Sequence, residues 1–350
     1  MKELIDFKEK IDKDKLEEVC KSIKDGSVIV FPTETVYGIG ANALDKSAVK
    51  KIFMAKNRPT DNPLIVHISN YDMLDKVVSN VSKYEKILMD KFWPGPLTII
   101  LPKKEEIPNI VTCNLDTVGV RMPSNKIAIN IIEKSGVPIA APSANISGKP
   151  SGTLVTDIVD ELKDSVDYII DGGISDIGLE STVVKLDNDV VNILRPGAIT
   201  KEDILDAGLK VHLDKHLFED VKENEKVASP GMKHRHYAPK VKTILVYSND
   251  EKKEYDRICD IINENNNKKI GILGFNENKE KYINKPNVKF MCIGSKHDLN
   301  SVAKNVFTVL RKVDKYDLDL SIIEGVEKQG IGLAIMNRLT RACGYNVIEL

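Results

Sequence analysis

The sequence has little of what marks a membrane protein, a secreted protein or a nucleic-acid-binding protein. No apolar run approaches the roughly 18 residues that a membrane span requires, and the opening stretch, MKELIDFKEKIDKDK, is too charged for a signal peptide. The 51 Lys and Arg residues nearly equal the 52 Asp and Glu residues, which leaves a formal charge of −1. Bulk electrostatics therefore recruits neither nucleic acid nor an anionic membrane, although a locally basic cleft is compatible with this balance. We expect a soluble, cytoplasmic protein that makes no membrane contact.

Several familiar site motifs are also missing. The five cysteines are scattered and include no C-x-x-C pair, which excludes a disulfide framework and a zinc knuckle. The sequence contains no G-x-x-x-x-G-K-[ST], no G-x-S-x-G and no H-E-x-x-H, so it lacks the signatures of a P-loop, a serine-hydrolase elbow and a zinc protease. Gly330-Ile331-Gly332 has no third glycine and predicts a helix entry rather than a dinucleotide site.

The chain is long enough for two domains, since 350 residues with 42% hydrophobic content can form two cores. Up to about residue 208, helical patterns alternate with short apolar runs that end in Pro or Gly. These runs predict strands at 28–32, 97–102, 118–123, 137–142 and 191–197. Strands alternating with helices predict an α/β fold, and its loops at strand ends are the place to look for chemistry.

A charged stretch without periodicity, residues 209–240, predicts a linker, and a second alternating region follows at 241–350. Strands are predicted at 242–248, 270–275, 288–294 and 320–325, with helices at 251–265, 298–313 and 332–342. In the first of these helices we expect Tyr255, Ile258, Cys259 and Ile262 to face inward. The alternation predicts a smaller, parallel, Rossmann-like domain.

Cations and small hydroxyl side chains gather where the strands of the first domain end. Lys56 and Arg58 belong to K-N-R-P, Arg195 belongs to L-R-P-G, and Ser143 and Asn145 follow an apolar strand. Such side chains could equally cap helices or make ordinary turns when each is taken alone. Taken together they indicate a pocket for a polyanion.

Arg121 is the most informative of these cations. The period of two in T-V-G-V-R-M-P places Arg121 on the same strand face as Thr117 and Gly119. A guanidinium on such a face is either paired with an internal carboxylate or ready for an anionic ligand, and the sequence does not decide between these alternatives.

The linker contains a basic, aromatic segment, P-G-M-K-H-R-H-Y-A-P (230–239). Two histidines at i and i+2 have no third ligand nearby, so we predict no metal site there. The segment suits a lid over a nucleotide, and the alternative is a solvated charged linker.

The motifs resemble those of one family, the YrdC-like threonylcarbamoyl-AMP synthases, in the form that has two domains. The resemblance rests on F-P-T-E-T-V-Y-G (31–38), K-N-R-P-x-D-N-P-L-I-V-H-I (56–68), W-P-G-P-L-T (93–98), V-R-M-P (120–123), A-P-S-A-N-x-S-G (141–148), E-S-T-V (180–183), L-R-P-G (194–197) and P-G-M-K-x-R-H-Y-A-P (230–239). It implies an N-terminal domain (1–208) with a twisted mixed sheet and a basic cavity, a linker or lid (209–240) and a C-terminal Rossmann-like domain (241–350).

The resemblance also implies an activity and a set of site residues. Members of this family condense L-threonine, bicarbonate or CO2, and ATP into threonylcarbamoyl-AMP and pyrophosphate, and a separate transferase then modifies tRNA. By motif position, the catalytic residues are Lys56, Arg58, Ser143 and Asn145, which engage the ATP phosphates. Further ATP contacts are implied for Asn62, Thr117, Ser151, Arg195, His236 and Tyr237, and L-threonine contacts for Thr35, His67, Arg121, Ala141 and Ser181.

Three details of these assignments stay open. Thr33 is the alternative to Thr35 as a threonine contact, and His234 stands where the family often has an aromatic hydroxyl, so it receives no ATP contact. We expect Mg²⁺ to reach the site on the ATP phosphates and water, because no carboxylate cluster is evident. Two other functions share the predicted pocket: an RNA-binding or regulatory module without turnover, with weak RNA contact through the cavity, and a hydrolase of acyl-adenylates.

Overall fold

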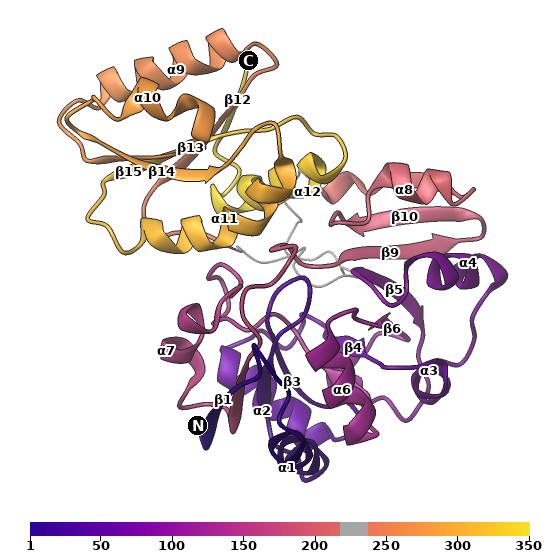
Figure 1. The fold of residues 1–350 in the computed structure, drawn as a ribbon. Helices are drawn as coiled ribbons and strands as arrows, with labels where there is room; N and C mark the ends of the chain where they lie inside the picture. The colour runs from indigo at the N-terminus through magenta and orange to yellow at the C-terminus, as the bar shows by residue number, and fades with distance from the viewer. Residues whose placement is uncertain (218–236) are drawn as a thin grey trace. The chain divides into compact units, whose positions relative to one another are not determined.

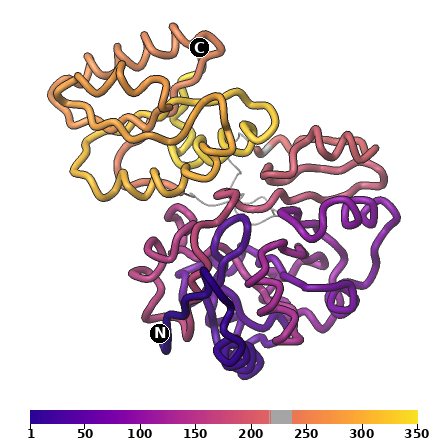
Figure 2. Tube along the Cα trace, in the orientation of Figure 1, coloured from indigo at the N-terminus to yellow at the C-terminus, as the bar shows by residue number. Residues whose placement is uncertain are grey.

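The structure is a computed structural model that describes residues 1–217 and 237–350. The described residues form two compact units (Figures 1 and 2): the first comprises 1–147 and 151–217, and the second comprises 148–150 and 237–350. Each unit is described by itself below. Most of the predicted linker lies outside the described residues, but its first part does not. Lys210–Leu213 form strand β11 and pair with β10 of the first unit.

The first unit contains one mixed sheet, as predicted. Its strand order over the described residues is β1-β8-β2-β3-β7-β4-β6-β5-β9-β10-β11, with parallel pairs such as β4 with β6 and antiparallel pairs such as β5 with β6. The strands are β1 (Glu3–Asp6), β2 (Ile29–Phe31), β3 (Gly38–Asn42), β4 (Ile65–His67), β5 (Leu97–Pro102), β6 (Thr117–Arg121), β7 (Ile139–Ala140), β8 (Tyr168–Asp171), β9 (Thr182–Asp187), β10 (Val190–Arg195) and β11.

Helices form where capping residues and apolar spacing agree. The first, α1 (Lys13–Lys24), begins at the N-cap Asp12, whose side chain accepts hydrogen bonds from the Asp14 and Lys15 amides, and it buries the apolar stripe of Leu16, Val19, Cys20 and Ile23. It packs against α6 (Lys126–Ser135), which ends at Gly136 in the left-handed region with φ of 66°. The other helices of this unit are α2 (Lys46–Lys56), α3 (Tyr71–Val77), α4 (Lys83–Phe92), α5 (Asn109–Thr112), α7 (Val159–Leu162) and α8 (Lys201–Asp206), and two short 3₁₀ turns, η1 (Val155–Asp157) and η2 (Lys215–Leu217), complete it.

Sheet register positions the predicted site residues. In the parallel pair of β4 and β6, His67 lies opposite Arg121. In the parallel pair of β5 and β9, Leu97 lies opposite Thr182, which places the neighbouring Ser181 beside the start of β5. The central strands are buried on both faces, as expected for a sheet that helices cover.

The second unit is a parallel Rossmann-like sheet, also as predicted. Its strand order is β14-β13-β15-β12-β16, and every pairing in it is parallel. The helices α9 and α10 lie on one side of this sheet and α11 and α12 on the other (Figure 1). The elements are β12 (Thr243–Tyr247), α9 (Glu251–Glu264), β13 (Ile270–Phe275), η3 (Asn276–Asn278), α10 (Lys279–Tyr282), β14 (Val288–Gly294), α11 (Leu299–Val313), β15 (Leu320–Glu324), α12 (Ile331–Ala342) and β16 (Val347–Glu349).

The inward face of α9 differs in part from the prediction. Ile258 and Ile262 are buried, and Tyr255 is half-buried and packs against the same core. Cys259 is also only half-buried, and Ile261 takes its place in the core, because the isoleucines of α9 form one apolar cluster with Val246 and Ile270 of the sheet. Over the described residues, no helix is both long and apolar enough to cross a membrane.

Candidate functional site

The loop between β2 and β3 is the centre of the candidate site, because two other loops with predicted site residues are hydrogen-bonded to it. The amides of Ile177 and Gly178 donate to the carbonyls of Glu34 and Thr35 at 2.9 and 3.0 Å. On its other side, the Ala144 amide donates to the Tyr37 carbonyl at 2.7 Å. Three segments that are far apart in the sequence are thereby held together.

Arg121, at the end of β6, has an internal carboxylate partner, which was one of the two alternatives that the sequence left open. Its Nη2 lies 2.6 Å from Oε1 of Glu34, and neither side chain is more than 6% exposed. Its Nη1 donates to Oγ1 of Thr35 at 2.8 Å, and its Nε donates to the Gly95 carbonyl at 3.2 Å. Burial raises the pKa of Glu34, but the charge and hydrogen bond of Arg121, together with the Glu34 and Ser124 amides, lower it overall. Glu34 therefore stays ionised.

Thr35 contacts Arg121 directly and Thr33 does not. The Thr33 hydroxyl donates to the Val36 carbonyl at 2.6 Å and lies 2.8 Å from the Thr35 hydroxyl. Because a hydroxyl has one proton, Thr35 must donate to Thr33 in this pair and accept from Arg121. The three side chains form a directed relay from Arg121 through Thr35 and Thr33 to the Val36 carbonyl.

His67 lies beside Arg121 and is uncharged. Burial, and next the positive charge of Arg121, lower its pKa to about 3, against opposing effects of Glu34 and of the Ile65 and Ile139 backbone. Its Nδ1 is buried and has no hydrogen-bond partner among the described residues. The ring meets Phe31 edge-on, with centroids 6.3 Å apart. A neutral imidazole fixed in this way can form one hydrogen bond to a polar ligand through Nδ1, but it cannot contribute a charge to the binding of that ligand.

Ala141 lies at the same place, just after β7. Its amide donates to the Ile65 carbonyl at 2.9 Å, which ties it to β4. A Cβ atom at Gly40 would come within 2.7 Å of Ile139 and 3.3 Å of the Ala141 methyl group. The small side chain of Ala141 and the bare backbone of β3 are therefore required by the same close approach.

Lys56 meets the loop that contains Ser143 and Asn145. It is the last residue of α2 and 1% exposed, and its Nζ donates to the carbonyls of Ser143 and Asn145 at 2.5 Å each. The Ser143 hydroxyl donates to Oδ1 of Asn145 at 2.6 Å. The C-cap Asn57, with φ of 50°, turns the chain so that Arg58 can reach back, and its guanidinium donates to the carbonyls of Asn62 and Pro63.

Arg195 meets Ser181 where the ends of β9 and β10 come close. Its Nε and Nη2 donate to the carbonyl and the hydroxyl of Ser181, both at 3.0 Å, and that hydroxyl lies 2.8 Å from Oγ1 of Thr98. The approach requires glycine at position 197, since a Cβ there would lie 2.4 Å from the Thr182 amide nitrogen. The neighbouring Ser151 donates to Oε1 of Glu180 at 2.5 Å.

Three further predicted ATP contacts, Thr117, His236 and Tyr237, stay predictions. Thr117 begins β6 whereas Arg121 ends it, so the two lie about 13 Å apart along the strand. His236 lies outside the described residues. Tyr237 is buried within the second unit, where its ring stacks on Phe307 with centroids 4.9 Å apart.

Sequence reasoning missed the side chains that hold the predicted ones. Glu34, Glu180 and Thr98 are each at most 6% exposed and contact Arg121, Ser151 and Ser181 respectively. All three stand inside the motifs P-T-E-T, E-S-T and P-L-T, so the signal was a carboxylate or hydroxyl embedded among residues already chosen. No group of three or more His, Cys, Asp and Glu side chains that could hold a metal ion occurs in the described part of the chain.

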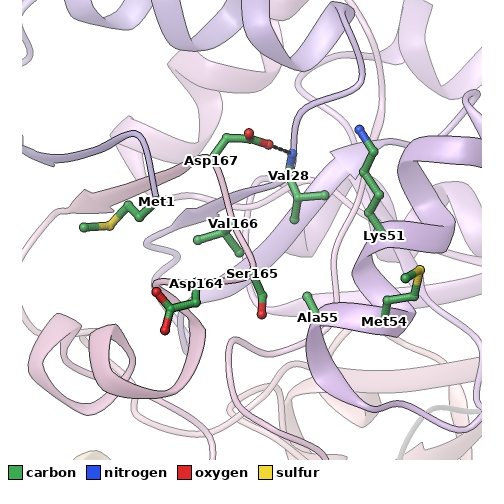
Figure 3. A pocket seen from close by; sticks show the side chains of 9 residues that line it. All are labelled: Met1, Val28, Lys51, Met54, Ala55, Asp164, Ser165, Val166 and Asp167. Atoms are coloured by element: carbon green, nitrogen blue, oxygen red, sulfur yellow. Dashed lines mark hydrogen bonds between the residues drawn. The ribbon is translucent and has the colours of Figure 1, made fainter.

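A cavity of about 570 Å³ on the first unit lies apart from this site (Figure 3). Its lining residues are Met1, Val28, Lys51, Met54, Ala55 and Asp164, Ser165, Val166 and Asp167, none of which we predicted as a site residue. Lys51 donates to the Gly26 carbonyl at 2.7 Å, and Asp167 accepts from the Val28 amide at 2.9 Å, so these two lining side chains are engaged by the protein itself.

Comparison with known proteins covers nearly the whole chain. Residues 21–197 match the Sua5/YciO/YrdC family model, described as telomere recombination, and residues 199–344 match the model described as threonylcarbamoyl-AMP synthase, C-terminal domain. The chain is 40% identical to a threonylcarbamoyl-AMP synthase of Pyrococcus abyssi over 99% of both chains. It is 43% identical to a threonylcarbamoyl-AMP synthase of Bacillus subtilis over 93% of this chain and 92% of that one.

A solved structure gives the same result in three dimensions. The crystal structure of P. abyssi Sua5 complexed with L-threonine superimposes with a TM-score of 0.91 at 40% identity, and the match covers 99% of both chains. A variant of the same protein that carries two alanine substitutions superimposes with a TM-score of 0.93 at 39% identity, over 100% of this chain and 98% of that one.

Proposed function

Because the chain belongs to the Sua5/YciO/YrdC family and carries the C-terminal domain of the threonylcarbamoyl-AMP synthases, we infer that it is an enzyme of that activity. It condenses L-threonine, bicarbonate or CO2, and ATP into L-threonylcarbamoyl-AMP and pyrophosphate for tRNA modification. The observation that carries this conclusion is the 40% identity to a synthase over 99% of both chains. The alternative, an RNA-binding or regulatory module without turnover, has no support among these relatives.

We propose that Arg121 and its neighbours bind L-threonine. A guanidinium can bind a carboxylate through two parallel hydrogen bonds, and Arg121 is aimed from three directions by Glu34, Thr35 and the Gly95 carbonyl. The buried, unpartnered Nδ1 of His67 supports a hydrogen bond to the substrate. The proposed threonine contacts are Thr35, His67, Arg121, Ala141 and Ser181.

ATP contacts are proposed for the cations and hydroxyls around the Ser143 loop. Lys56 is 1% exposed and already bound to two carbonyls of that loop, which supports a fixed positive charge beside the Ser143 and Asn145 side chains. The proposed ATP contacts are Lys56, Arg58, Asn62, Thr117, Ser143, Ser151, Arg195, His236 and Tyr237. Thr117 has the least support, since it lies at the far end of β6.

The reaction needs charge stabilisation and proximity rather than a side-chain nucleophile. The threonine amine adds to CO2, and an oxygen of the resulting carbamate attacks the α-phosphorus of ATP in line while pyrophosphate leaves. Lys56, Arg58 and Arg195 would stabilise the negative charge that spreads over the phosphates, and Arg121 would keep the threonine carboxylate away from the phosphorus. Mg²⁺ would bind ATP phosphates and water, because the described residues offer no cluster of carboxylates for it.

The product is a mixed anhydride that hydrolyses easily, so we propose that a separate transferase consumes it and moves the threonylcarbamoyl group to tRNA. Pyrophosphate release from ATP tests the synthase activity itself. We expect release to require both L-threonine and bicarbonate. Release in the absence of either substrate would contradict the proposed function.

A further inference from the structure

The strongest unassigned observation is the position of Glu34 in the threonine site. Glu34 is 5% exposed, and its backbone is fixed by a hydrogen bond from the Ile177 amide to its carbonyl at 2.9 Å. Its Oε1 lies 2.6 Å from Nη2 of Arg121, and the Glu34 and Ser124 amides also help to lower its pKa, yet among the described residues no hydrogen bond of normal geometry reaches either carboxylate oxygen. An ionised carboxylate can accept about four hydrogen bonds. Glu34 therefore has unused acceptor capacity in a buried place.

The net charge of the buried Arg121–Glu34 pair limits which ligands can bind beside it. A lone guanidinium would suit any small anion, including phosphate. With Glu34 beside it, the Arg121 charge is already balanced, so a simple anion would leave the buried group with a net negative charge. A zwitterion would not, because it brings one positive and one negative group together.

L-threonine is such a zwitterion. We propose that Glu34 is a threonine-binding residue that accepts hydrogen bonds from the α-ammonium group of L-threonine, while Arg121 binds the carboxylate. Glu34 then determines specificity, because it favours amino acids over anions that lack an amine. This inference rests on the proposed function, which supplies the ligand.

The neighbouring groups support the assignment. Thr35 accepts from Arg121 and donates to Thr33, so its hydroxyl offers the ligand no proton. His67 is neutral, so it has no charge with which to balance the charge of an ammonium group. Among the described side chains within contact of Arg121, Glu34 is thus the one that can balance an ammonium group.

The test compares two ligands on the full-length protein by isothermal titration calorimetry. L-threonine has the ammonium group, and 2,3-dihydroxybutyrate replaces it with a hydroxyl. In Glu34→Gln we expect L-threonine to bind about 10- to 100-fold more weakly, the loss typical of a charge-assisted hydrogen bond. The same variant should bind 2,3-dihydroxybutyrate about 10-fold more tightly, because Arg121 is then unbalanced.

Opposite changes for the two ligands separate this role from mere structural damage, which would weaken both. Glu85→Gln is the matched control: Glu85 is also buried, accepts from the Ser82 amide at 2.6 Å, and lies in the capping box of α4. This control should lower the melting temperature and leave the preference for L-threonine unchanged. ATP binding by each variant verifies that it is folded.

If Glu34→Gln does not fold, the wild-type protein and Glu34→Asp still decide the matter. The wild type should strongly prefer L-threonine to 2,3-dihydroxybutyrate, and Glu34→Asp, which keeps the charge, should keep part of that preference. Equal affinity of the wild type for both ligands would overturn the role of Glu34 while leaving pyrophosphate release intact. A wild type that binds no L-threonine would overturn this role and the proposed function together.

Discussion

The two units bury carboxylates in opposite ways. In the first unit, Glu34 is paired with Arg121, and its pKa is lowered. In the second, Glu324 at the end of β15 accepts from the Phe275 amide and the Tyr282 hydroxyl, both at 2.8 Å, and burial raises its pKa. Burial, and next the nearby Glu324, raise the pKa of Glu254 to about 8.

The contrast separates two uses of a buried acid. Glu34 is kept ionised beside a fixed cation, which suits a site where charged reactants meet. Glu324 joins the carboxyl end of β15 to β13 and α10 through hydrogen bonds, and Glu254 accepts from the Gly325 amide at 3.2 Å. The buried acids of the second unit thus hold strand ends together through hydrogen bonds. The four predictions below address these two roles, a charged site in the first unit and structural acids in the second.

The largest effect is expected from separating the pair in the first unit. Arg121→Met leaves Glu34 as an uncompensated buried charge, which should cost about 3–5 kcal/mol of unfolding free energy. The double variant Arg121→Met with Glu34→Gln should recover a large part of that loss, since no unpaired charge remains. Urea denaturation measures both. If the single and double variants have the same free energy of unfolding, the loss of stability does not come from the unpaired charge of Glu34.

The next effect concerns turnover. Lys56→Ala should lower kcat/KM about 10²- to 10³-fold, the usual cost of a lost electrostatic contact to a transition state. Lys51→Ala is the matched control, because Lys51 is on the same helix and also donates to a carbonyl, that of Gly26. It should leave kcat/KM unchanged in a pyrophosphate-release assay. A large fall in melting temperature without loss of turnover in Lys56→Ala would assign Lys56 to stability instead.

A third prediction concerns pH in the second unit. The pKa of Glu254 is raised on folding, so its folded form binds more protons than its unfolded form, and its contribution to stability is present below about pH 4.5 and lost as pH rises toward about 8. The urea concentration at the midpoint of unfolding of the second unit should therefore decrease as the pH is raised from 5 to 8. Glu254→Gln should flatten this slope. Glu34 has the opposite sign, since its lowered pKa makes its contribution disappear as pH falls.

The smallest effect is expected from the hydroxyl relay. Thr33→Val removes the acceptor of the Thr35 proton and should cost about 1 kcal/mol of stability. It should also raise the KM for L-threonine a few-fold, because Arg121 loses part of its alignment. Thr112→Val removes a similar buried bond, from Thr112 to the Leu115 carbonyl, and should cost stability with no change in KM. Equal KM values in the two variants would remove the relay from threonine binding.

The strands that could be predicted from sequence are those whose apolar runs stop at Pro or Gly, such as 97–102, where the structure has β5 with the same bounds. β3 could not be predicted, because Gly38 and Gly40 give it little strand propensity. Its reason for being there is tertiary: Phe31 and Ile139 come so close that a Cβ at Gly40 would lie within 2.8 Å of both. β11 was missed for a similar reason, since its half-exposed residues become a strand only by pairing with β10.

The site divides along the same line. The motifs predicted Arg121 and Thr35 as site residues, because unusual cations and hydroxyls at strand ends are visible along the sequence. Which groups would touch was not visible, since the contact of Arg121 with Glu34 joins a strand to a loop 87 residues earlier in the chain. The motifs named the candidate residues, whereas their contacts depend on the fold: the sheet register places His67 opposite Arg121, and the loop between β2 and β3 brings Glu34 to Arg121.

The relay from Arg121 to the Val36 carbonyl gives the proposed threonine site a fixed polarity. A hydroxyl in water can turn to meet either a donor or an acceptor, but the protons of Thr35 and Thr33 are committed, and reversing one would require reversing the other. Whatever approaches Thr35 meets only an oxygen lone pair. When this enzyme is redesigned for other amino acids, the new substrate should carry a hydrogen-bond donor on its side chain near Thr35. A substrate with an ether or a ketone there would offer only acceptors and should be avoided.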